Sequence, residues 1–221
     1  MAVYRDVAPL FNRGENDLPE EVASRLLDAV GRGELVVLPT DTVYGIGADP
    51  FSSLAVMRLL GAKGRDNSMP PPVLGAFTEE LLGLCKFTSL EQRDVVTALA
   101  DAFWPGPLTI IAPAAVQFGW DGSSVGDTIA VRMPQSELAL SALQMTGPLA
   151  VTSANRTGFP PSETVEEAHE YFGSEVAVYV DGGPSPLGQA STIVDCTGAT
   201  PRLIRAGAIT LKQIQELLKS I

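Results

Sequence analysis

The pattern of apolar and polar positions divides the chain into short helices and strands. Apolar residues repeat at helical spacing in some segments, and they alternate or run together at strand spacing in others. The helical pattern predicts helices over 18–33, 52–63, 89–103 and 135–145, a helix that begins at Thr164, and a last helix capped by Thr210 with Gln213. The strand pattern predicts strands over 35–38, 108–112, 128–133, 149–152, 176–180, 191–195 and 202–204.

The order of these elements indicates the fold class. Helices and strands are mixed without the regular alternation of a doubly wound fold, so we expect an α+β protein. The number of strands favours one large, twisted, mixed β-sheet flanked by helices. No repeat, low-complexity tract or long linker interrupts the sequence, and residues 1–221 are therefore predicted to form a single domain.

Composition narrows the class of protein further. Apolar residues make up 45% of the chain and charged residues 19%, which excludes a disordered protein. No apolar run is long enough to span a membrane, and the N-terminus lacks the pattern of a signal peptide. Cys85 and Cys196 have no CxxC spacing, so neither a disulfide framework nor a zinc site is expected. These observations predict a cytoplasmic protein without membrane contact and without a metal site built from its side chains.

Positive charge is scarce, and its positions are therefore informative. The net charge is −11, which argues against broad binding of nucleic acid through its phosphates. Between residues 94 and 201 the only cations are Arg132 and Arg156. Arg132 ends the strand pattern DTIAVRMP and shares one face of that strand with Thr128. Such an arginine lies either on an exposed edge strand or beside a partner that offsets its burial.

Two further cations lie at the end of a predicted helix. In LLGAKGRDNSMPPP, Gly61 and Gly64 end the helix, and the prolines that follow prevent it from resuming. Lys63 and Arg65 therefore emerge where the helix passes into a loop. Cations at this position either stabilise the helix C-terminus or form a site for an anion.

Small polar residues gather at three junctions between predicted strands and loops. These junctions are PTDTVYG at 39–45, TSAN at 152–155 and ST at 191–192. Each is either ordinary turn chemistry or a means of orienting a small polar ligand. Together with the isolated cations, they predict a site for an anionic small molecule.

Other kinds of active site find little support. The sequence contains no P-loop, no Rossmann glycine motif and no GxSxG, so Ser153 is a poor candidate for a hydrolase nucleophile. The single histidine, His169, lies in the acidic helical pattern TVEEAHEYF and is predicted to be a solvated helix residue. A triad that depends on histidine is therefore not expected.

Seven segments in a fixed order are more specific than any one of them. LPTDTVYGIG, AKGR, FWPGPLTII, DTIAVRMP, TSANRTG, ASTIVD and LIRAG follow one another between about residues 33 and 207. This set resembles the YrdC/TsaC family of threonylcarbamoyl-AMP synthases in its short, single-domain form. The resemblance implies a YrdC/RibB-like fold and a nucleotidyltransferase that converts L-threonine, bicarbonate and ATP into threonylcarbamoyl-AMP and pyrophosphate.

The resemblance also assigns roles to residues. The catalytic signature of lysine, arginine, serine and asparagine matches Lys63, Arg65, Ser153 and Asn155. The implied contacts with L-threonine are Thr40, Arg132 and Ser191, and those with the nucleotide are Lys63, Arg65, Thr128, Val151, Ser153, Asn155, Pro161 and Arg205. Mg²⁺ is expected together with ATP, because a metal that bridges phosphates needs few protein ligands.

The implied product also suggests partners. Threonylcarbamoyl-AMP would pass to proteins that transfer the threonylcarbamoyl group to tRNA, and direct contact with tRNA is expected to be weak. The chain departs from the family pattern at Asp66, Pro71 and Leu74, the last standing where many members have a histidine. Two other functions stay open, an RNA-binding module without catalysis and a carbamoyl-transfer domain.

Overall fold

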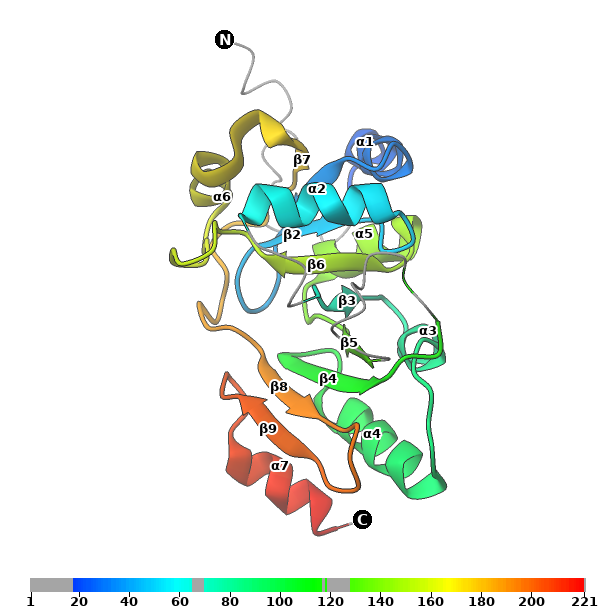
Figure 1. Ribbon diagram of the computed structural model, residues 1–221. Helices are drawn as coiled ribbons and strands as arrows, with labels where there is room; N and C mark the ends of the chain where they lie inside the picture. The colour runs from blue at the N-terminus through cyan, green and yellow to red at the C-terminus, as the bar shows by residue number, and fades with distance from the viewer. Residues whose placement is uncertain (1–17, 65–69, 117, 119–127, 221) are drawn as a thin grey trace.

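One mixed sheet runs through the described part of the protein. The structure is a computed structural model and describes residues 18–64, 70–116, 118 and 128–220. In these residues nine strands form a sheet in the order β7-β1-β2-β6-β3-β5-β4-β8-β9 (Figure 1). The strands are β1 (Leu35–Leu38), β2 (Gly45–Ala48), β3 (Val73–Leu74), β4 (Leu108–Pro113), β5 (Thr128–Arg132), β6 (Leu149–Ser153), β7 (Val176–Tyr179), β8 (Thr192–Asp195) and β9 (Arg202–Arg205).

Both strand directions occur within this sheet. Three neighbouring pairs are parallel, namely β1 with β7, β3 with β5, and β4 with β8. The other five pairs are antiparallel. The prediction of an α+β fold with a large mixed sheet is therefore confirmed.

Helices cover both faces of the sheet. They are α1 (Glu20–Gly31), α2 (Ser53–Lys63), α3 (Thr78–Gly83), α4 (Leu90–Phe103), α5 (Glu137–Thr146), α6 (Val165–Phe172) and α7 (Leu211–Leu218), with a 3₁₀ turn at Gly173–Glu175. Residues of α1 and α5 form one apolar cluster with β1, β6 and β7. Residues of α2, α4, α6 and α7 form a second, larger cluster, and α2 crosses the sheet in front of β2 and β6 in Figure 1.

The predicted elements are confirmed, with shifts of a few residues at their ends. Three short elements, β2, β3 and α3, were not predicted. Gly45 and Gly47 in β2 carry no side chain that would favour a strand, yet β2 pairs with β1 on one side and β6 on the other. Pairing on both edges therefore forms a strand that the local sequence does not indicate.

Side-chain caps fix where several helices begin. Ser52, Ser89 and Ser136 each accept a hydrogen bond from the backbone N–H three residues later. The predicted capping box of Thr210 with Gln213 is confirmed. Only half of the predicted box at Thr164 forms, because the Glu167 carboxylate accepts from the N–H of Glu163 instead.

The end of α2 places the first site residue. As the sequence predicted, the helix stops at Gly64, which adopts the left-handed conformation with φ of 63°. Lys63 is thus the last helical residue, and its side chain leaves α2 where the chain turns away.

Two leucines of α2 test how the helix is held on the sheet. Leu59 is fully buried, whereas Leu54 is 60% exposed on the same helix. We expect Leu59→Ala to lower the free energy of unfolding by about 2–5 kcal/mol, because it removes buried contacts and leaves a cavity. Leu54→Ala should cost less than about 0.5 kcal/mol. Urea denaturation followed by circular dichroism measures both, and equal losses would contradict the described packing of α2.

Candidate active site

The ammonium group of Lys63 lies in a buried ring of carbonyl oxygens. The residue is 1% exposed. Its Nζ donates to the backbone oxygen of Ser153 at 2.5 Å, to the Asn155 side-chain oxygen at 3.2 Å, and to the backbone oxygen of Asn155. These three acceptors match the three protons of the ammonium group. Lys63 therefore orients the turn that carries Ser153 and Asn155, and it places a positive charge beneath that turn.

Further hydrogen bonds fix the same turn. The side-chain amide of Asn155 donates to the backbone oxygens of Arg156, at 2.9 Å, and Phe159, at 2.7 Å. The Ser162 hydroxyl donates to the backbone oxygen of Ala154. The side-chain oxygen of Asn155 accepts from Lys63, and its side-chain nitrogen donates to two backbone oxygens. The orientation of Asn155 is therefore fixed before any ligand binds.

A second buried cation lies at the end of β5. Arg132 is 6% exposed, and Asp41, which is 4% exposed, lies beside it. The guanidinium donates to Asp41 Oδ1 at 2.6 Å, to Thr42 Oγ1 at 2.9 Å and to the backbone oxygen of Gly106 at 3.0 Å. The alternative of an exposed edge strand is therefore wrong, because β5 lies between β3 and β4 and its arginine has a partner.

Burial and charge act on Arg132 in opposite directions. Burial lowers the pKa of the guanidinium, while the Asp41 carboxylate raises it and the nearby cation Arg205 lowers it. The group keeps its charge because arginine deprotonates only far above neutral pH. The site thus holds a buried positive charge within reach of a second one.

Arg205 belongs to a third group of polar contacts. Its guanidinium donates to the Ser191 hydroxyl at 2.9 Å and to the Ser191 backbone oxygen at 3.0 Å. The Ser191 hydroxyl also lies 2.8 Å from that of Thr109 on β4. An expected threonine contact, Ser191, and an expected nucleotide contact, Arg205, are therefore direct neighbours.

Strand register relates these groups to one another. Leu74 of β3 pairs with both Leu149 and Arg132, so these residues share one face of the sheet. Ser153 comes four residues after Leu149, and Thr128 comes four residues before Arg132, which keeps both on that face. β6 runs antiparallel to β3, and β5 runs parallel to it. Four residues forward along β6 and four residues backward along β5 therefore lead to the same end of the face. Thr128 and Ser153 both lie at that end, about 13 Å along the strands from Arg132.

Three other expected contacts have different surroundings. The Thr40 hydroxyl donates to the backbone oxygen of Val43 at 2.6 Å, so it is used within its own loop. Val151 is buried at the level of Gly47, and a Cβ added to Gly45 would lie only 2.6 Å from its side chain. Pro161 is exposed, one residue before the buried Ser162. Arg65 and Asp66 lie outside the described residues.

Some functional contacts could not be assigned from the sequence. Asp41 and Thr42 lie in the PTDTVYG segment, but nothing in the sequence identified them as partners of Arg132. Thr109, which contacts Ser191, sits inside an apolar strand pattern. The signal for Asp41 was indirect, because a buried arginine requires an acidic partner somewhere in the chain.

The histidine and the cysteines have surroundings of their own. His169 is half-buried, and its ring lies 5.2 Å from that of Tyr179, so the prediction of a solvated helix residue is wrong. Cys85 and Cys196 are buried free thiols. Burial raises the pKa of each to about 12, which leaves almost no thiolate at neutral pH.

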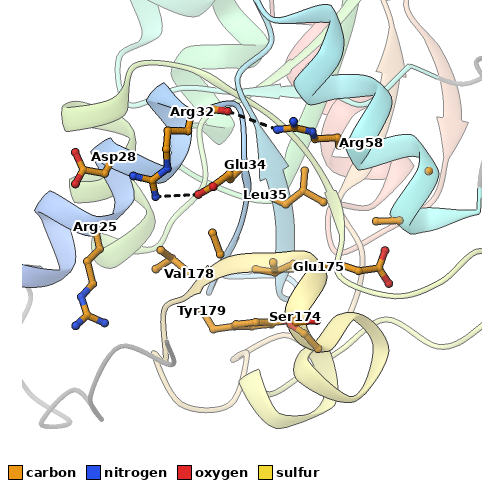
Figure 2. A pocket seen from close by; sticks show the side chains of 15 residues that line it. Arg25, Asp28, Arg32, Glu34, Leu35, Arg58, Ser174, Glu175, Val178 and Tyr179 are labelled. Atoms are coloured by element: carbon orange, nitrogen blue, oxygen red, sulfur yellow. Dashed lines mark hydrogen bonds and ion pairs between the residues drawn. The ribbon is translucent and has the colours of Figure 1, made fainter. Parts of the chain in front are cut away.

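A groove lies at another place on the molecule. It has a volume of about 880 Å³ and is formed by α1, α2, β1 and the segment from Gly173 to Tyr179 (Figure 2). Its charged lining residues are Arg25, Arg32, Arg58, Asp28, Glu34 and Glu175. Arg32 pairs with Glu34 at 2.9 Å, and the charges balance. None of the expected site residues that the structure describes lines this groove.

The residue types of this site indicate a class of protein, and a comparison with known proteins identifies the family. Buried cations beside amide and hydroxyl side chains at the ends of strands are typical of proteins that bind an anionic small molecule. Residues 28–207 match the Sua5/YciO/YrdC family, described as "Telomere recombination". The chain belongs to this family.

Named relatives cover most of the chain. A putative threonylcarbamoyl-AMP synthase of Mycobacterium tuberculosis H37Rv is 44% identical over 203 residues, or 90% of this chain and 92% of the relative. The threonylcarbamoyl-AMP synthase of Klebsiella pneumoniae is 33% identical over 195 residues, or 87% of this chain and 99% of the relative.

A solved structure shares the fold as well. The crystal structure of Pyrococcus abyssi Sua5 complexed with L-threonine superimposes with a TM-score of 0.81 at 34% identity. The match covers 90% of this chain but 58% of that protein, so this chain spans little more than half of its length.

Removal of the Lys63 ammonium tests the carbonyl ring. We expect Lys63→Met to lower the free energy of unfolding by about 1–3 kcal/mol, because buried carbonyl oxygens lose their donor. Lys86→Met, which removes the same charge from an exposed position, should change it by less than about 0.5 kcal/mol. Thermal and urea denaturation measure both variants, and an unchanged Lys63→Met protein would contradict the described contacts.

The buried thiols give a second test of the site. With a pKa near 12, roughly 10⁻⁴ of each thiol is ionised at pH 8, and burial limits access as well. We expect iodoacetamide to leave both cysteines of the folded protein unmodified at pH 8, and to modify both in urea. Mass spectrometry after timed quenching measures this. Rapid modification of the folded protein together with loss of activity would place a thiol in the site.

Proposed function

We propose that the chain is a threonylcarbamoyl-AMP synthase whose active site is the sheet face described above. L-Threonine and bicarbonate combine with loss of water to give N-carboxythreonine. One oxygen of the new carboxylate then attacks the α-phosphorus of ATP, and the bond to pyrophosphate breaks. The observation that carries this proposal is that each of the site's scarce cations lies among fixed polar side chains, in a chain with a net charge of −11. Lys63 contacts Ser153 and Asn155, and Arg205 contacts Ser191 and lies near Arg132.

Arg132 is the proposed anchor for the threonine carboxylate. A guanidinium has five N–H donors, and three of them are used by Asp41, Thr42 and Gly106. Among the described residues, the other two donors have no partner, and two is the number that a carboxylate needs for a bidentate contact. Ser191 and Thr40 complete the proposed threonine subsite. Because the Thr40 hydroxyl already donates to the backbone oxygen of Val43, we propose that Thr40 contacts the substrate through its methyl group or its backbone.

The other end of the face is the proposed nucleotide subsite. Ser153 and Thr128 lie there by strand register, and Asn155 follows Ser153 on the turn held by Lys63. Arg65 is proposed to contact the phosphates, with Val151 and Pro161 bordering the nucleotide. Arg205 lies at the Arg132 end of the face beside Ser191, and it is proposed to contact the nucleotide from there.

These residue types suit adenylyl transfer. The reaction develops charge on phosphate oxygens, and fixed cations and amides stabilise that charge without forming a covalent intermediate. The burial of both cysteine thiols and their raised pKa are compatible with such a mechanism. The described residues contain no group of three or more His, Cys, Asp or Glu side chains that could hold a metal. We therefore expect Mg²⁺ to enter as part of MgATP, coordinated chiefly by phosphates and water.

The product points to a further partner. A mixed anhydride with AMP is reactive, and its threonylcarbamoyl group is expected to pass in the cytoplasm to proteins that modify tRNA. An RNA-binding module without catalysis is the second candidate, and the net charge disfavours it. A carbamoyl-transfer domain is the third. Dependence of the reaction on L-threonine separates the proposed enzyme from both.

Release of pyrophosphate by the purified protein tests the function directly. We expect release only when ATP, bicarbonate and L-threonine are all present, because the attacking carboxylate forms from two of them. A coupled pyrophosphate assay measures the rate, and mass spectrometry identifies the threonylcarbamoyl-AMP adduct. No release by folded protein that binds ATP would contradict the proposal.

Arg65 and Arg93 provide a matched pair of arginines. We expect Arg65→Ala to lower kcat/KM by roughly 10²–10³-fold, the effect of removing one group that stabilises developing charge. Arg93→Ala removes the same charge from the exposed surface of α4 and should leave the rate unchanged. Equal rates for the two variants would remove Arg65 from the proposed phosphate contacts.

A further inference from the structure

One oxygen of the Asp41 carboxylate lacks a hydrogen-bond donor in the described part of the chain. Oδ1 accepts from Arg132 Nη2 at 2.6 Å and from the backbone N–H of Gln135 at 2.9 Å. Oδ2 is buried without a partner. A buried charged oxygen without a donor is costly, and native structures usually reserve such a group for water, an ion or a ligand.

The position of this oxygen suggests which ligand it receives. Arg132 Nη2 donates a hydrogen bond to Asp41 Oδ1, so Oδ2 of the same carboxylate lies within a few ångströms of the guanidinium. An α-amino acid carries a carboxylate and an ammonium group separated by a single carbon atom. If the carboxylate occupies the two remaining N–H groups of Arg132, its ammonium group lies within reach of Asp41.

The surroundings of Asp41 have room at one side. Asp41 and Thr40 line a cavity of about 160 Å³ with Gln135, Ser136 and the segment from Gly182 to Pro186. This space has room for a few water-sized groups, and Arg132 is not among its lining residues. Oδ2 itself is covered, so the amino group reaches it only when neighbouring side chains move aside on binding.

We infer that Asp41 Oδ2 accepts a hydrogen bond from the α-amino group of the amino-acid substrate. Asp41 then has two functions, since one oxygen holds Arg132 and the other selects ligands with an amino group beside the carboxylate. This inference rests on the proposed function, because it uses Arg132 as the carboxylate anchor. It adds a residue that contacts the very nitrogen that becomes carboxylated.

A cycle of two proteins and two ligands tests the inference. The ligands are L-threonine and 2,3-dihydroxybutyrate of the same configuration, in which a hydroxyl replaces the amino group. Calorimetry measures the Kd of each for wild-type protein and for Asp41→Asn, with a non-hydrolysable ATP analogue present. In Asp41→Asn the amide oxygen can still accept from Arg132 and Gln135, which directs the amide N–H₂ toward the position of Oδ2.

The expected result is a loss specific to the amino group. Wild-type protein should bind L-threonine roughly 10- to 100-fold more tightly than the dihydroxy acid, as expected for a hydrogen bond between charged groups. Asp41→Asn should abolish most of that preference because it raises the Kd of L-threonine. The Kd of the dihydroxy acid should change less than about threefold. An equal rise in the Kd of both ligands would show that Asp41 only positions Arg132, and it would overturn the inference.

Two control variants separate charge and positioning effects. Glu137→Gln removes one negative charge from the exposed first turn of α5 and should change neither Kd. Thr42→Val removes another hydrogen-bond partner of Arg132 and should raise the Kd of both ligands by the same factor. If Asp41→Asn does not fold, the wild-type protein still decides, because equal affinity for the two ligands overturns the inference.

The outcomes also distinguish this inference from the proposed function. Binding of L-threonine with the expected preference but no release of pyrophosphate would overturn the proposed reaction and support the role of Asp41. Release of pyrophosphate without a change of preference in Asp41→Asn would overturn the role of Asp41 alone. Absence of any L-threonine binding would overturn both.

Discussion

The buried ion pair between Arg132 and Asp41 joins two parts of the chain that the sheet keeps apart. Asp41 lies in the loop between β1 and β2, whereas Arg132 ends β5, and β6 and β3 lie between β2 and β5 in the sheet. The loop therefore passes over the sheet to reach the arginine. This contact brings the small polar residues of PTDTVYG beside the strands that carry the other site residues.

A buried pair of this kind is stable only when its geometry is good. Removing two charges from water costs several kcal/mol per ion, about as much as their attraction returns. Arg132 meets this demand with three acceptors, and Asp41 Oδ1 accepts two donors. The remaining groups, two N–H of the guanidinium and one carboxylate oxygen, are complementary to the charged ends of an amino acid. The ion pair thus holds the loop, and under the proposed function its remaining polar groups would receive the amino acid.

Much of the fold could be predicted from the sequence because the helices and longer strands have clear apolar periodicity. The β2 strand could not, because its glycines carry no apolar signal and its pairing on both edges is a property of the whole sheet. For the site, the ordered segments indicated Lys63, Arg132, Ser153, Asn155, Ser191 and Arg205, and the structure groups them as Lys63 with Ser153 and Asn155, and Ser191 with Arg205. The partner of Arg132 could not be predicted, because the ion pair joins residues 91 positions apart.

The arrangement of subsites follows from strand direction. Because β6 and β5 run in opposite directions on either side of β3, Ser153 at the end of β6 and Thr128 at the start of β5 lie at the same end of the strands. Arg132 then lies at the opposite end of that face, with Arg205 near enough to lower the pKa of its guanidinium. A nucleotide at the first end and an amino acid at the second would direct the α-phosphate and the new carboxylate toward each other. Positioning of this kind joins two reactants by reducing the entropy that their encounter costs, and it needs no nucleophile from the protein.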